Sequence, residues 1–418
     1  MKLNKSLVGW MMYDFANSAF TTIIVSVVYS AYFVGTVVGG EKGYGEMLWG
    51  RAVGISMALV AISAPILGAV ADYSRAKKRM LFFNCYLTVI FTALLYFVGP
   101  GSIMMGMVFF IIANYGFNSA NVFYDSFLPD IASPSDIGKV SGYGWALGYV
   151  GGLLSLLYSL WIINTSPSQV RWVFPAVALH FLIFSSFLFI WLKEFKRPSK
   201  RTNYYRVAVQ RIGYSIRHIR QLPQLLRFIL SYFIYNDGIT TVIAFASIYG
   251  IERFGMDTKA MIVYFILAQF TSIIGAALFG VVSDKWSSKV SLSISLLIWI
   301  AVVIWAFFCG SAGEYYLVGL LAGLAIGSSQ ANSRTILSQL TPRSKQAEFF
   351  GFYALTGRLS SIIGPVLYGW IAHKTGDIRW SILSIMFFFI IGWILLRAVN
   401  LRKGILEADQ MDLAQTNL

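Results

Sequence analysis

The sequence predicts an all-α membrane protein whose twelve transmembrane helices form two pseudo-symmetric bundles of six. Three observations support this prediction: an apolar composition, long apolar runs, and a repeat between the two halves of the chain. Hydrophobic residues make up 57% of the 418 residues and charged residues only 12%, whereas a soluble domain carries about 25% charged residues. A membrane is therefore the expected environment.

The apolar runs are long enough to cross a bilayer, which takes roughly 20 residues in a helix. They are too long for barrel strands and lack the alternation of such strands, so helices are expected. No small-residue cleavage site follows the first run, which we interpret as a retained span and not as a signal peptide. The expected spans cover residues 8–38, 48–71, 80–98, 103–128, 140–163, 172–192, 226–250, 260–282, 290–309, 315–340, 349–372 and 379–399.

The net charge of +15 follows from where the basic residues lie. Most of the 33 Lys and Arg fall on the side of the expected membrane that holds both termini. Because basic loops stay in the cytoplasm, we expect a multi-pass protein of the cell inner (cytoplasmic) membrane with both termini cytoplasmic. This topology explains the surplus of basic residues, so no nucleic-acid partner is expected. The few basic residues on the other side are Lys42, Arg51, Arg171, Arg253, Lys259, Lys374 and Arg379.

The second half of the chain repeats short patterns of the first half, in the same order. Six spans, a long linker and six further spans are the arrangement of the major facilitator fold, in which two related bundles surround a central site. The matching positions are Gly68 and Asp72 with Gly280 and Asp284, and Ser133-Pro134 with Thr341-Pro342.

Four segments follow from this repeat. Residues 1–192 form the first bundle, 193–225 a basic cytoplasmic linker, 226–400 the second bundle and 401–418 a cytoplasmic tail. The linker has two interpretations of equal weight. Its apolar residues at helical spacing fit an amphipathic helix on the anionic inner leaflet, and its basic charge also fits a solvated tether.

The first span carries a polar face. Asp14, Asn17, Ser18 and Thr21 are spaced so that they lie on one side of a helix. A charge inside a membrane span costs several kcal/mol unless it faces a partner or a water-filled cavity, which makes it a candidate functional residue. We therefore expect the first span to line a path for a polar solute.

Other spans add polar side chains that are unfavourable against lipid. These residues either bind or couple the transported solute, or they form structural ion pairs between the bundles. Because Asp125 and Arg334 occupy equivalent places in the two halves, we hypothesise that they pair. An arginine would suit a carboxylate or phosphate, and a dry site favours the neutral form of an acid, which could carry a proton. The further candidates are Asn118, Asn121, Asp125, Asp237, Gln330, Arg334 and Arg358, with Asn114 on the same stripe as Asn118.

The turns after the second and eighth spans share a Gly-x-x-x-Asp spacing. The glycines are expected to let neighbouring helices approach closely, and the aspartates to cap a helix or to pair with a basic residue in a latch. Ordinary loop charge is the alternative. The residues of this gating or structural group are Gly68, Asp72, Arg75, Gly280, Asp284 and Lys285.

Two glycine patterns predict helix geometry. Gly144, Gly148 and Gly152 in the fifth span form a small-residue ridge for close packing. Gly364-Pro365 is expected to bend the eleventh span, since proline removes a backbone donor and clashes with the preceding turn.

Cofactor chemistry finds little support in the sequence. The two cysteines and three histidines are scattered, so neither a metal site nor another cofactor is expected. No Gly-x4-Gly-Lys-Ser/Thr loop for nucleotide phosphates occurs. An integral-membrane enzyme would need clustered catalytic groups, so we expect a protein that is not an enzyme. The residues concerned are Cys85, Cys309, His180, His218 and His373.

Several blocks resemble a known family. The turn after the second span resembles the signature turn of the major facilitator superfamily, with departures at Tyr73 and Arg75. Further blocks resemble the fungal vacuolar amino-acid effluxer family linked to autophagy and its bacterial relatives. They are Trp10-x-x-Tyr13-Asp14-Phe15-Ala16-Asn17-Ser18-Ala19-Phe20, Phe123-Tyr124-Asp125-Ser126-Phe127-Leu128-Pro129-Asp130, Gly142-x-Gly144-Trp145-Ala146-Leu147-Gly148-Tyr149, Gln330-Ala-Asn-Ser333-Arg334 and Glu348-Phe349-Phe350-Gly351-Phe352-Tyr353. The family pattern usually has Asn at the position of Asp125 and Lys at that of Arg358.

The resemblance implies a secondary transporter of a small polar solute that works by alternating access, with amino-acid efflux or exchange as the expected activity. Protons are a candidate coupling ion, and a monomer is the expected form. Two alternatives stay open, because function does not transfer safely with a fold. The solute could be another small metabolite or a drug, or the protein could be a transporter-like receptor that binds a ligand without moving it.

Overall fold

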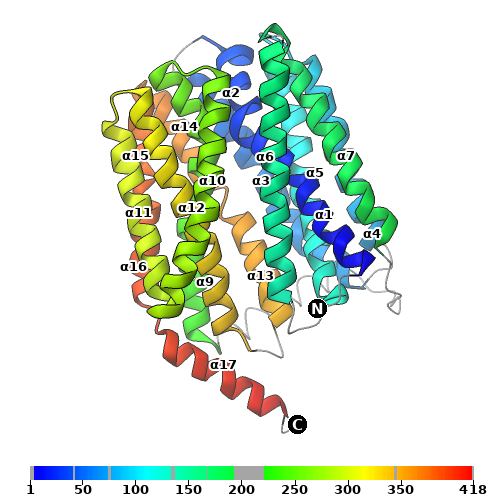
Figure 1. The fold of residues 1–418 in the computed structure, drawn as a ribbon, viewed down its shortest axis with the longest axis vertical. Coiled ribbons are helices and arrows are strands. Elements are labelled where there is room, and N and C mark those ends of the chain that lie inside the picture. Colours follow the sequence, from blue (N-terminus) through cyan, green and yellow to red (C-terminus); the bar gives the residue numbers. More distant parts are fainter. Residues whose placement is uncertain are drawn as a thin grey trace.

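The computed structural model describes residues 4–40, 43–73, 77–132, 137–165, 167–192, 221–342 and 346–416. Within these ranges the chain is almost entirely helical and contains no strand. Long helices run side by side along one axis (Figure 1). Both termini lie at one end of this bundle, called here the terminal end, and the opposite end is called the far end. The predicted linker helix lies outside the described residues.

Ten helical segments of the described chain are long and apolar enough to span a membrane. Two further stretches, α12 and the broken pair α13–α14, occupy the places predicted for the tenth and eleventh spans and pack against these segments. The all-α membrane architecture is therefore confirmed. The elements of the first half are α1 (Lys5–Ala19), η1 (Phe20–Val27), α2 (Tyr29–Tyr32), η2 (Phe33–Val38), α3 (Tyr44–Tyr73), α4 (Lys77–Leu94), η3 (Leu95–Phe97), α5 (Ile103–Ile131), α6 (Ile137–Thr165), η4 (Pro167–Trp172) and α7 (Val173–Trp191).

The second half begins at Pro223, three positions before the expected start of the seventh span. A helix not foreseen in the sequence, α17, follows the last span at the terminal end (Figure 1). The elements of this half are α9 (Pro223–Phe254), α10 (Thr258–Lys285), α11 (Ser288–Phe308), α12 (Ala312–Leu340), α13 (Gln346–Leu359), α14 (Ile363–Thr375), α15 (Ile378–Ser384), α16 (Met386–Arg397) and α17 (Leu401–Thr416).

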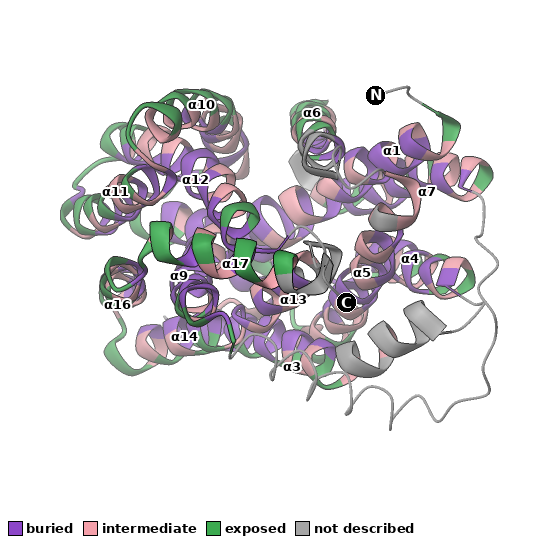
Figure 2. Ribbon diagram, turned by 90° about the horizontal axis from the view of Figure 1, so that it is seen from below, coloured by how far each residue is buried: buried purple, intermediate pink, exposed green. Residues whose placement is uncertain are grey.

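Each half uses the same helix pairings. In the first half α1 packs on α6 and α7, while α4 packs on α5 and α7. In the second half α9 packs on α14 and α16, while α11 packs on α12 and α16. Seen from the terminal end, the two groups lie side by side with α3 and α13 near their boundary (Figure 2). The predicted two-bundle repeat is therefore present in the packing.

The first span changes helix type in its middle. Residues of η1 form wider π-type turns, in which Val28 N–H donates to the Ile23 carbonyl at 2.8 Å and the Ser26 hydroxyl donates to the Thr21 carbonyl at 2.9 Å. Such turns are rare and are often found at functional sites, because they change which residues face a neighbour. Here they lie between α1 and the far end.

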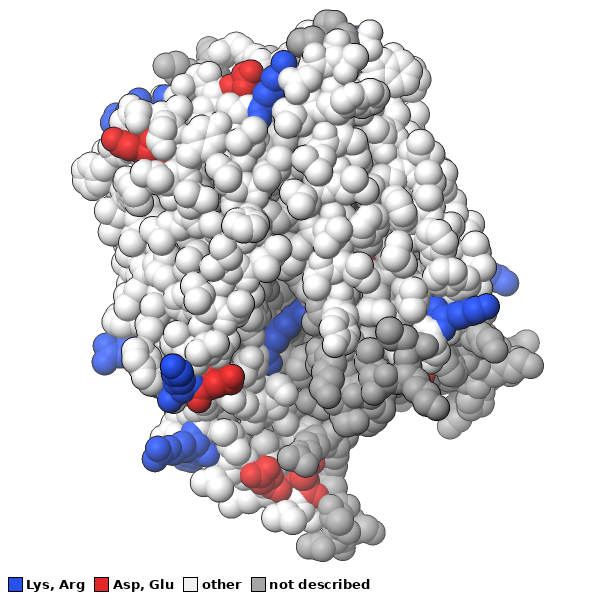
Figure 3. Space-filling view, in the orientation of Figure 1, with Lys and Arg blue, Asp and Glu red and all other residues white. Residues whose placement is uncertain are grey.

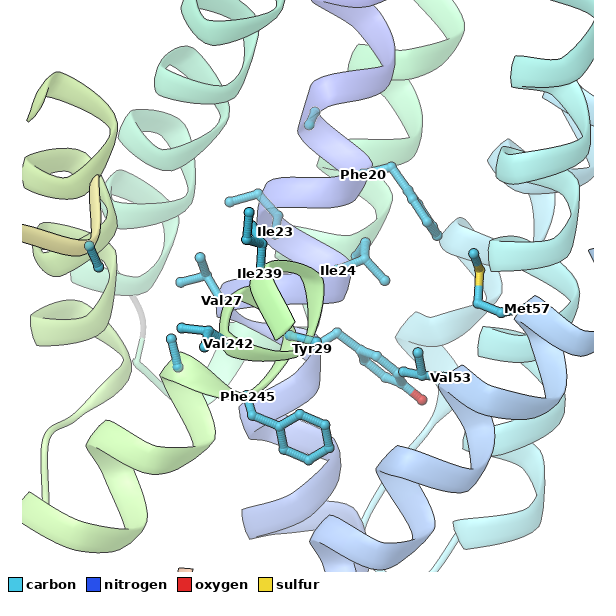
Figure 4. Packing of buried hydrophobic residues seen from close by; sticks show 14 of the residues in the cluster. Phe20, Ile23, Ile24, Val27, Tyr29, Val53, Met57, Ile239, Val242 and Phe245 are labelled. Carbon is cyan, nitrogen blue, oxygen red and sulfur yellow. The ribbon is translucent and has the colours of Figure 1, made fainter. Parts of the chain in front are cut away.

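The η1 segment contacts the second half of the molecule. Figure 4 shows its Ile23 and Val27 close to Ile239 and Val242 of α9, whereas Phe20 points toward Met57. Two hydrogen bonds reinforce this contact between the halves. The Ser247 hydroxyl donates to the Val27 carbonyl at 2.8 Å, and the Trp49 indole donates to the Ala244 carbonyl at 3.3 Å. The halves are thus sealed together in the part of the bundle nearer the far end.

Close backbone contact strengthens this seal. On α3, Gly50 lies against the carbonyl of Pro365, and on α14, Gly369 lies against the carbonyl of Glu46. A Cβ atom at either glycine would overlap the opposite backbone. Glycine at these positions therefore lets α3 and α14, which belong to different halves, approach to the distance that excludes water and lipid.

The glycine predictions have mixed outcomes. The ridge on α6 is confirmed, because Gly144 and Gly148 lie against Asp14 and Ser18 of α1. The eleventh span is interrupted between α13 and α14, close to the predicted Gly364-Pro365 bend. The prediction for Gly280 was wrong: no atom lies within 4 Å of the place that a Cβ would occupy. A repeated sequence spacing does not ensure a repeated neighbour.

The α1–α6 contact can be tested by adding a single methyl group. A Cβ at Gly151 would overlap the backbone of Phe15, so we expect Gly151→Ala to lower the free energy of unfolding by about 1–3 kcal/mol. Thermal unfolding in detergent measures the change. Gly280→Ala is the matched control: its methyl meets open space, and alanine favours a helix by about 1 kcal/mol over glycine. An unchanged melting temperature for Gly151→Ala would contradict the packing.

Candidate functional site

The polar face of α1 lies against helices of its own half. The Asp14 carboxylate and the Ser18 hydroxyl face α6, where Gly144 and Gly148 leave room for them. The Ser18 hydroxyl also donates to the Asp14 carbonyl at 2.8 Å. On the α5 side, the Asn17 amide donates to the Asn121 side chain at 3.3 Å. The face predicted from the sequence is therefore turned away from lipid.

Aromatic rings surround the Asp14 carboxylate. Trp10 and Tyr13 of α1 stack on Tyr124 of α5, with ring centroids 4.5 and 4.7 Å apart. The Trp10 indole donates to the Tyr124 carbonyl at 3.1 Å. The Tyr124 hydroxyl faces Asp14, and the described residues offer that buried hydroxyl no well-aligned acceptor. A buried hydroxyl beside a carboxylate provides a donor for a bound polar group.

Arg334 brings a positive charge from the second half. Its guanidinium lies 4.6 Å from the ring centroid of Trp145, which α6 contributes from the first half. Arg334 and Asp125 both lie within electrostatic reach of Asp14. In Figure 3 one basic group is set back from the surrounding apolar surface in the lower half of the molecule, between the two halves. Opposite charges from separate halves therefore meet in one region.

The partner of Asp125 differs from the one hypothesised. Its carboxylate pairs with Arg358 at the end of α13, across the boundary between the halves. The side chains are 38% and 14% exposed respectively, so water reaches this ion pair inside the bundle. The hypothesis of an Asp125–Arg334 pair was wrong because equivalent positions are related by the pseudo-symmetry and need not touch. Across the boundary, α5 packs on α13.

Asp237 caps a helix. Both of its carboxylate oxygens accept the backbone N–H of Gly364, at 2.9 and 3.0 Å, at the start of α14. Its neighbour Asn236 donates to the Gly357 carbonyl at 3.1 Å and to the Ser360 hydroxyl at 2.8 Å. Together they satisfy backbone groups freed by the break between α13 and α14. The structure thus gives Asp237, only 2% exposed, a structural contact, and its binding role stays a prediction.

The remaining amides of the fourth span satisfy one another. Asn114 donates to the Ser56 hydroxyl at 2.7 Å, and Asn118 donates to the Asn114 side chain at 3.1 Å. Both are buried within the first half. Gln330 is half-buried on α12, one helical turn before Arg334. The polar stripe of α5 therefore divides into a structural part at Asn114 and Asn118 and a part near the charges at Asn121 and Asp125.

The structure describes most of the residues that the sequence predicted as a latch at the two turns. Gly68 and Asp72 lie in α3, and Arg75 lies outside the described residues. Asp284 and Lys285 are exposed at the end of α10.

The structure shows an ion pair beside the turn after α3, between Lys77 and Asp130. This pair was not predicted from the sequence. The buried Lys77 ammonium lies 2.7 Å from the Asp130 carboxylate and 4.3 Å from the Phe127 ring centroid. The sequence signal was weak, since Lys77 stands within an ordinary basic loop run. This pair joins α4 to α5 within the first half.

The arrangement is shared with solved transporters of the major facilitator type. A mutant form of the nucleoside transporter NupG has a TM-score of 0.71 at 13% identity, over 94% of this chain and 99% of that one. The D-xylose-proton symporter has a TM-score of 0.71 at 16% identity, over 96% and 98%. These likenesses show the fold, which is that of a major facilitator membrane transporter.

The chain belongs to the family described as "Vacuole effluxer Atg22 like", whose model matches residues 51–138 and 134–409. It is 28% identical to the uncharacterized MFS-type transporter YxiO of Bacillus subtilis (strain 168), over 94% of both chains. It is 27% identical to autophagy-related protein 22 of Eremothecium gossypii, over 72% of this chain and 66% of that protein. The resemblance predicted from the sequence is confirmed: the protein is a transporter of the major facilitator type.

The capping role of Asp237 predicts a change in stability. Asp237→Ala leaves the buried N–H of Gly364 without an acceptor, which costs about 1–3 kcal/mol. We expect a lower melting temperature in detergent for this variant and a smaller decrease for Asp237→Asn, which keeps one side-chain oxygen. A residue that served only the solute would give the opposite pattern, in which Asp237→Ala melts like the wild type and loses transport.

Proposed function

We propose that this protein is a secondary transporter that moves a small zwitterionic solute, an amino acid, across the membrane by alternating access. The observation that carries the proposal is the meeting of charges from the two halves inside the bundle. Asp14 and Asp125 come from the first half, and Arg334 and Arg358 come from the second. Placing a charge inside a bilayer costs free energy, and a membrane protein tolerates this cost where the charges face a polar solute or one another.

The chemistry of the region suits an amino acid. A planar guanidinium pairs with a carboxylate through two parallel hydrogen bonds, so Arg334 is the candidate group for the solute carboxylate. Asp14 is the candidate group for the ammonium, with the Tyr124 hydroxyl beside it. Trp145, 41% exposed and in contact with Arg334, offers a ring surface to the solute side chain. Asn17 and Ser18 extend this polar face along α1.

The way in which the two halves are joined supports alternating access. Nearer the far end, the contacts between them are apolar side chains and glycine backbone. At the terminal end, a partly exposed ion pair between Asp125 and Arg358 links α5 to α13. We propose that this pair forms and breaks as the halves rock about the central charges. Figure 3 shows basic groups at both ends of the molecule. The sequence places most of the Lys and Arg residues at the terminal end, which supports placing that end in the cytoplasm.

Efflux or exchange is the proposed mode, in keeping with the described activity of the family. A proton is the proposed coupling ion, with Asp14 and Asp125 as its candidate carriers inside the bundle. A transporter of another small metabolite would accept non-zwitterionic solutes, and a receptor would bind ligand without moving it. Both alternatives give distinct results in the measurement below.

Asp14 is tested by counterflow. Wild-type protein in liposomes preloaded with an amino-acid mixture is expected to accumulate labelled amino acid from outside. Asp14→Asn removes the charge with little change in shape, and we expect it to lower this rate by about ten-fold or more, the effect of losing about 1.4 kcal/mol of stabilisation.

The matched control for this variant is Asp409→Asn, the same chemical change on the exposed surface of α17. It should leave counterflow at the wild-type rate. Saturable binding without accumulation in the wild type would favour a receptor, and accumulation of only uncharged solutes would favour another class of cargo. Wild-type flux in Asp14→Asn would remove this residue from the site.

The Asp125–Arg358 pair is tested by exchanging its charges. Asp125→Asn and Arg358→Gln each remove one charge of a partly exposed pair and leave the other charge without its partner inside the bundle. We expect each single variant to transport poorly and the exchange Asp125→Arg with Arg358→Asp to recover part of the counterflow rate. Independent losses in the double variant, with no recovery, would show that the pair does not act as a unit.

A further inference from the structure

A second charged region lies at the far end, away from the central charges. There the structure forms a half-open cavity of about 300 Å³, at the lower end of the 300–1,000 Å³ range of small-molecule pockets. The start of α3 contributes Gly43 and Glu46 from the first half. The second half contributes Glu252 and Arg253 at the end of α9, and the turn between α14 and α15.

One charged pair in this cavity is already satisfied. The Arg379 guanidinium holds the Asp377 carboxylate through contacts of 2.6–3.1 Å. This contact keeps the pKa of Asp377 below its usual value, so the carboxylate is ionised at neutral pH. Asp377 also accepts the Arg379 backbone N–H at the start of α15. The pair therefore fixes the turn and contributes no net charge to the cavity.

Glu46 differs from this pair. It is only 2% exposed and it lines the cavity. Within the described chain, no ion pair reaches its carboxylate. Its position in the first turn of α3 places it near free backbone N–H groups, which favour a negative charge. Glu252 lies within electrostatic reach of it. Glu46 and Glu252 thus line the cavity together with the Arg253 guanidinium, which also lies within electrostatic reach of Asp377.

We infer that this cavity is a second binding site, for an amino acid whose side chain is cationic. Glu46 and Glu252 would take its two ammonium groups, and Arg253 its carboxylate. This inference rests on the proposed function in taking an amino acid as the cargo. A metal ion suits the site less well, since the described residues contain no group of three His, Cys, Asp or Glu that could hold one, and two guanidinium groups stand beside the acids.

The position of the site gives it a role in transport. Glu46 comes from the first half and its companions from the second, so the site exists only while the far end is closed. Opening that end separates Glu46 from Glu252 and Arg253. A solute held there occupies the approach to the sealed region of η1 and α9. The site therefore would hold cationic amino acids on the far side before or after they pass the central charges.

The test uses a variant that no longer binds at the centre. Purified full-length Asp14→Asn protein in detergent is titrated with L-lysine by isothermal titration calorimetry, with L-leucine and L-glutamate as comparison ligands. We expect saturable binding of L-lysine, weaker binding of L-leucine and no binding of L-glutamate. Adding Glu252→Gln or Arg253→Gln, both at exposed positions, should weaken L-lysine binding about ten-fold, the effect of about 1.4 kcal/mol. Glu46→Gln should do the same.

The matched controls in that background are Glu314→Gln and Lys374→Gln, exposed at the same end but outside the cavity. They should leave the affinity for L-lysine unchanged. Absence of L-lysine binding in Asp14→Asn, or equal losses in the controls, would overturn the second site. Binding that depends on Glu252 and Arg253, in a protein whose wild type shows no amino-acid counterflow, would support the site and contradict the proposed function. The two outcomes are thus distinguishable.

Discussion

The cost of placing charge in a bilayer determines how this protein is arranged. An acid or a guanidinium in the membrane interior is tolerated only beside a partner, a polar cavity or backbone groups. Most interior charges described above meet one of these conditions, and Asp14 lies among the polar groups of Tyr124 and Asn17. Asp125 and Arg358 pair with each other, Asp237 accepts a backbone N–H, and Arg334 lies over the ring of Trp145. The helices bring these groups together from both halves.

The two ends of the bundle meet this constraint in different ways. Toward the far end, apolar side chains of η1 and α9 and glycines of α3 and α14 join the halves with little charge. Toward the terminal end, the halves meet through an ion pair that water reaches. Tight apolar packing is lost over small separations, whereas an ion pair in contact with water exchanges its partner for solvent at modest cost. The terminal contact is therefore the one suited to opening first.

Sequence patterns predicted the features that depend on a single helix. The polar face of α1, the glycine ridge of α6 and the interruption near Gly364 follow from spacing or from residue type alone. The partner of Asp125 depends on which helices of the two halves face each other. The spacing of residues along one helix does not reveal which helix of the other half it contacts. The cap formed by Asn236 and Asp237 was hidden for the same reason, because the break that it satisfies lies on another helix. Glu46 stands in the sequence as an ordinary acid near a helix start, and only the fold shows that α14 and α9 enclose it.

The Asp125–Arg358 contact also gives a physical meaning to two departures from the family pattern. The resemblance described in the sequence analysis implies Asn and Lys at these positions in the family, which would place a neutral amide near a cation. Replacing the amide by a carboxylate turns the contact into a full ion pair, and replacing Lys by Arg supplies a planar fork that matches a carboxylate. Each change alone would alter the net charge or the geometry of the region. Made together, they add one strong contact between α5 and α13 beside the break at Ser360. Asn236 donates to the Ser360 hydroxyl at this break, so the ion pair stands beside the interruption of the eleventh span between α13 and α14.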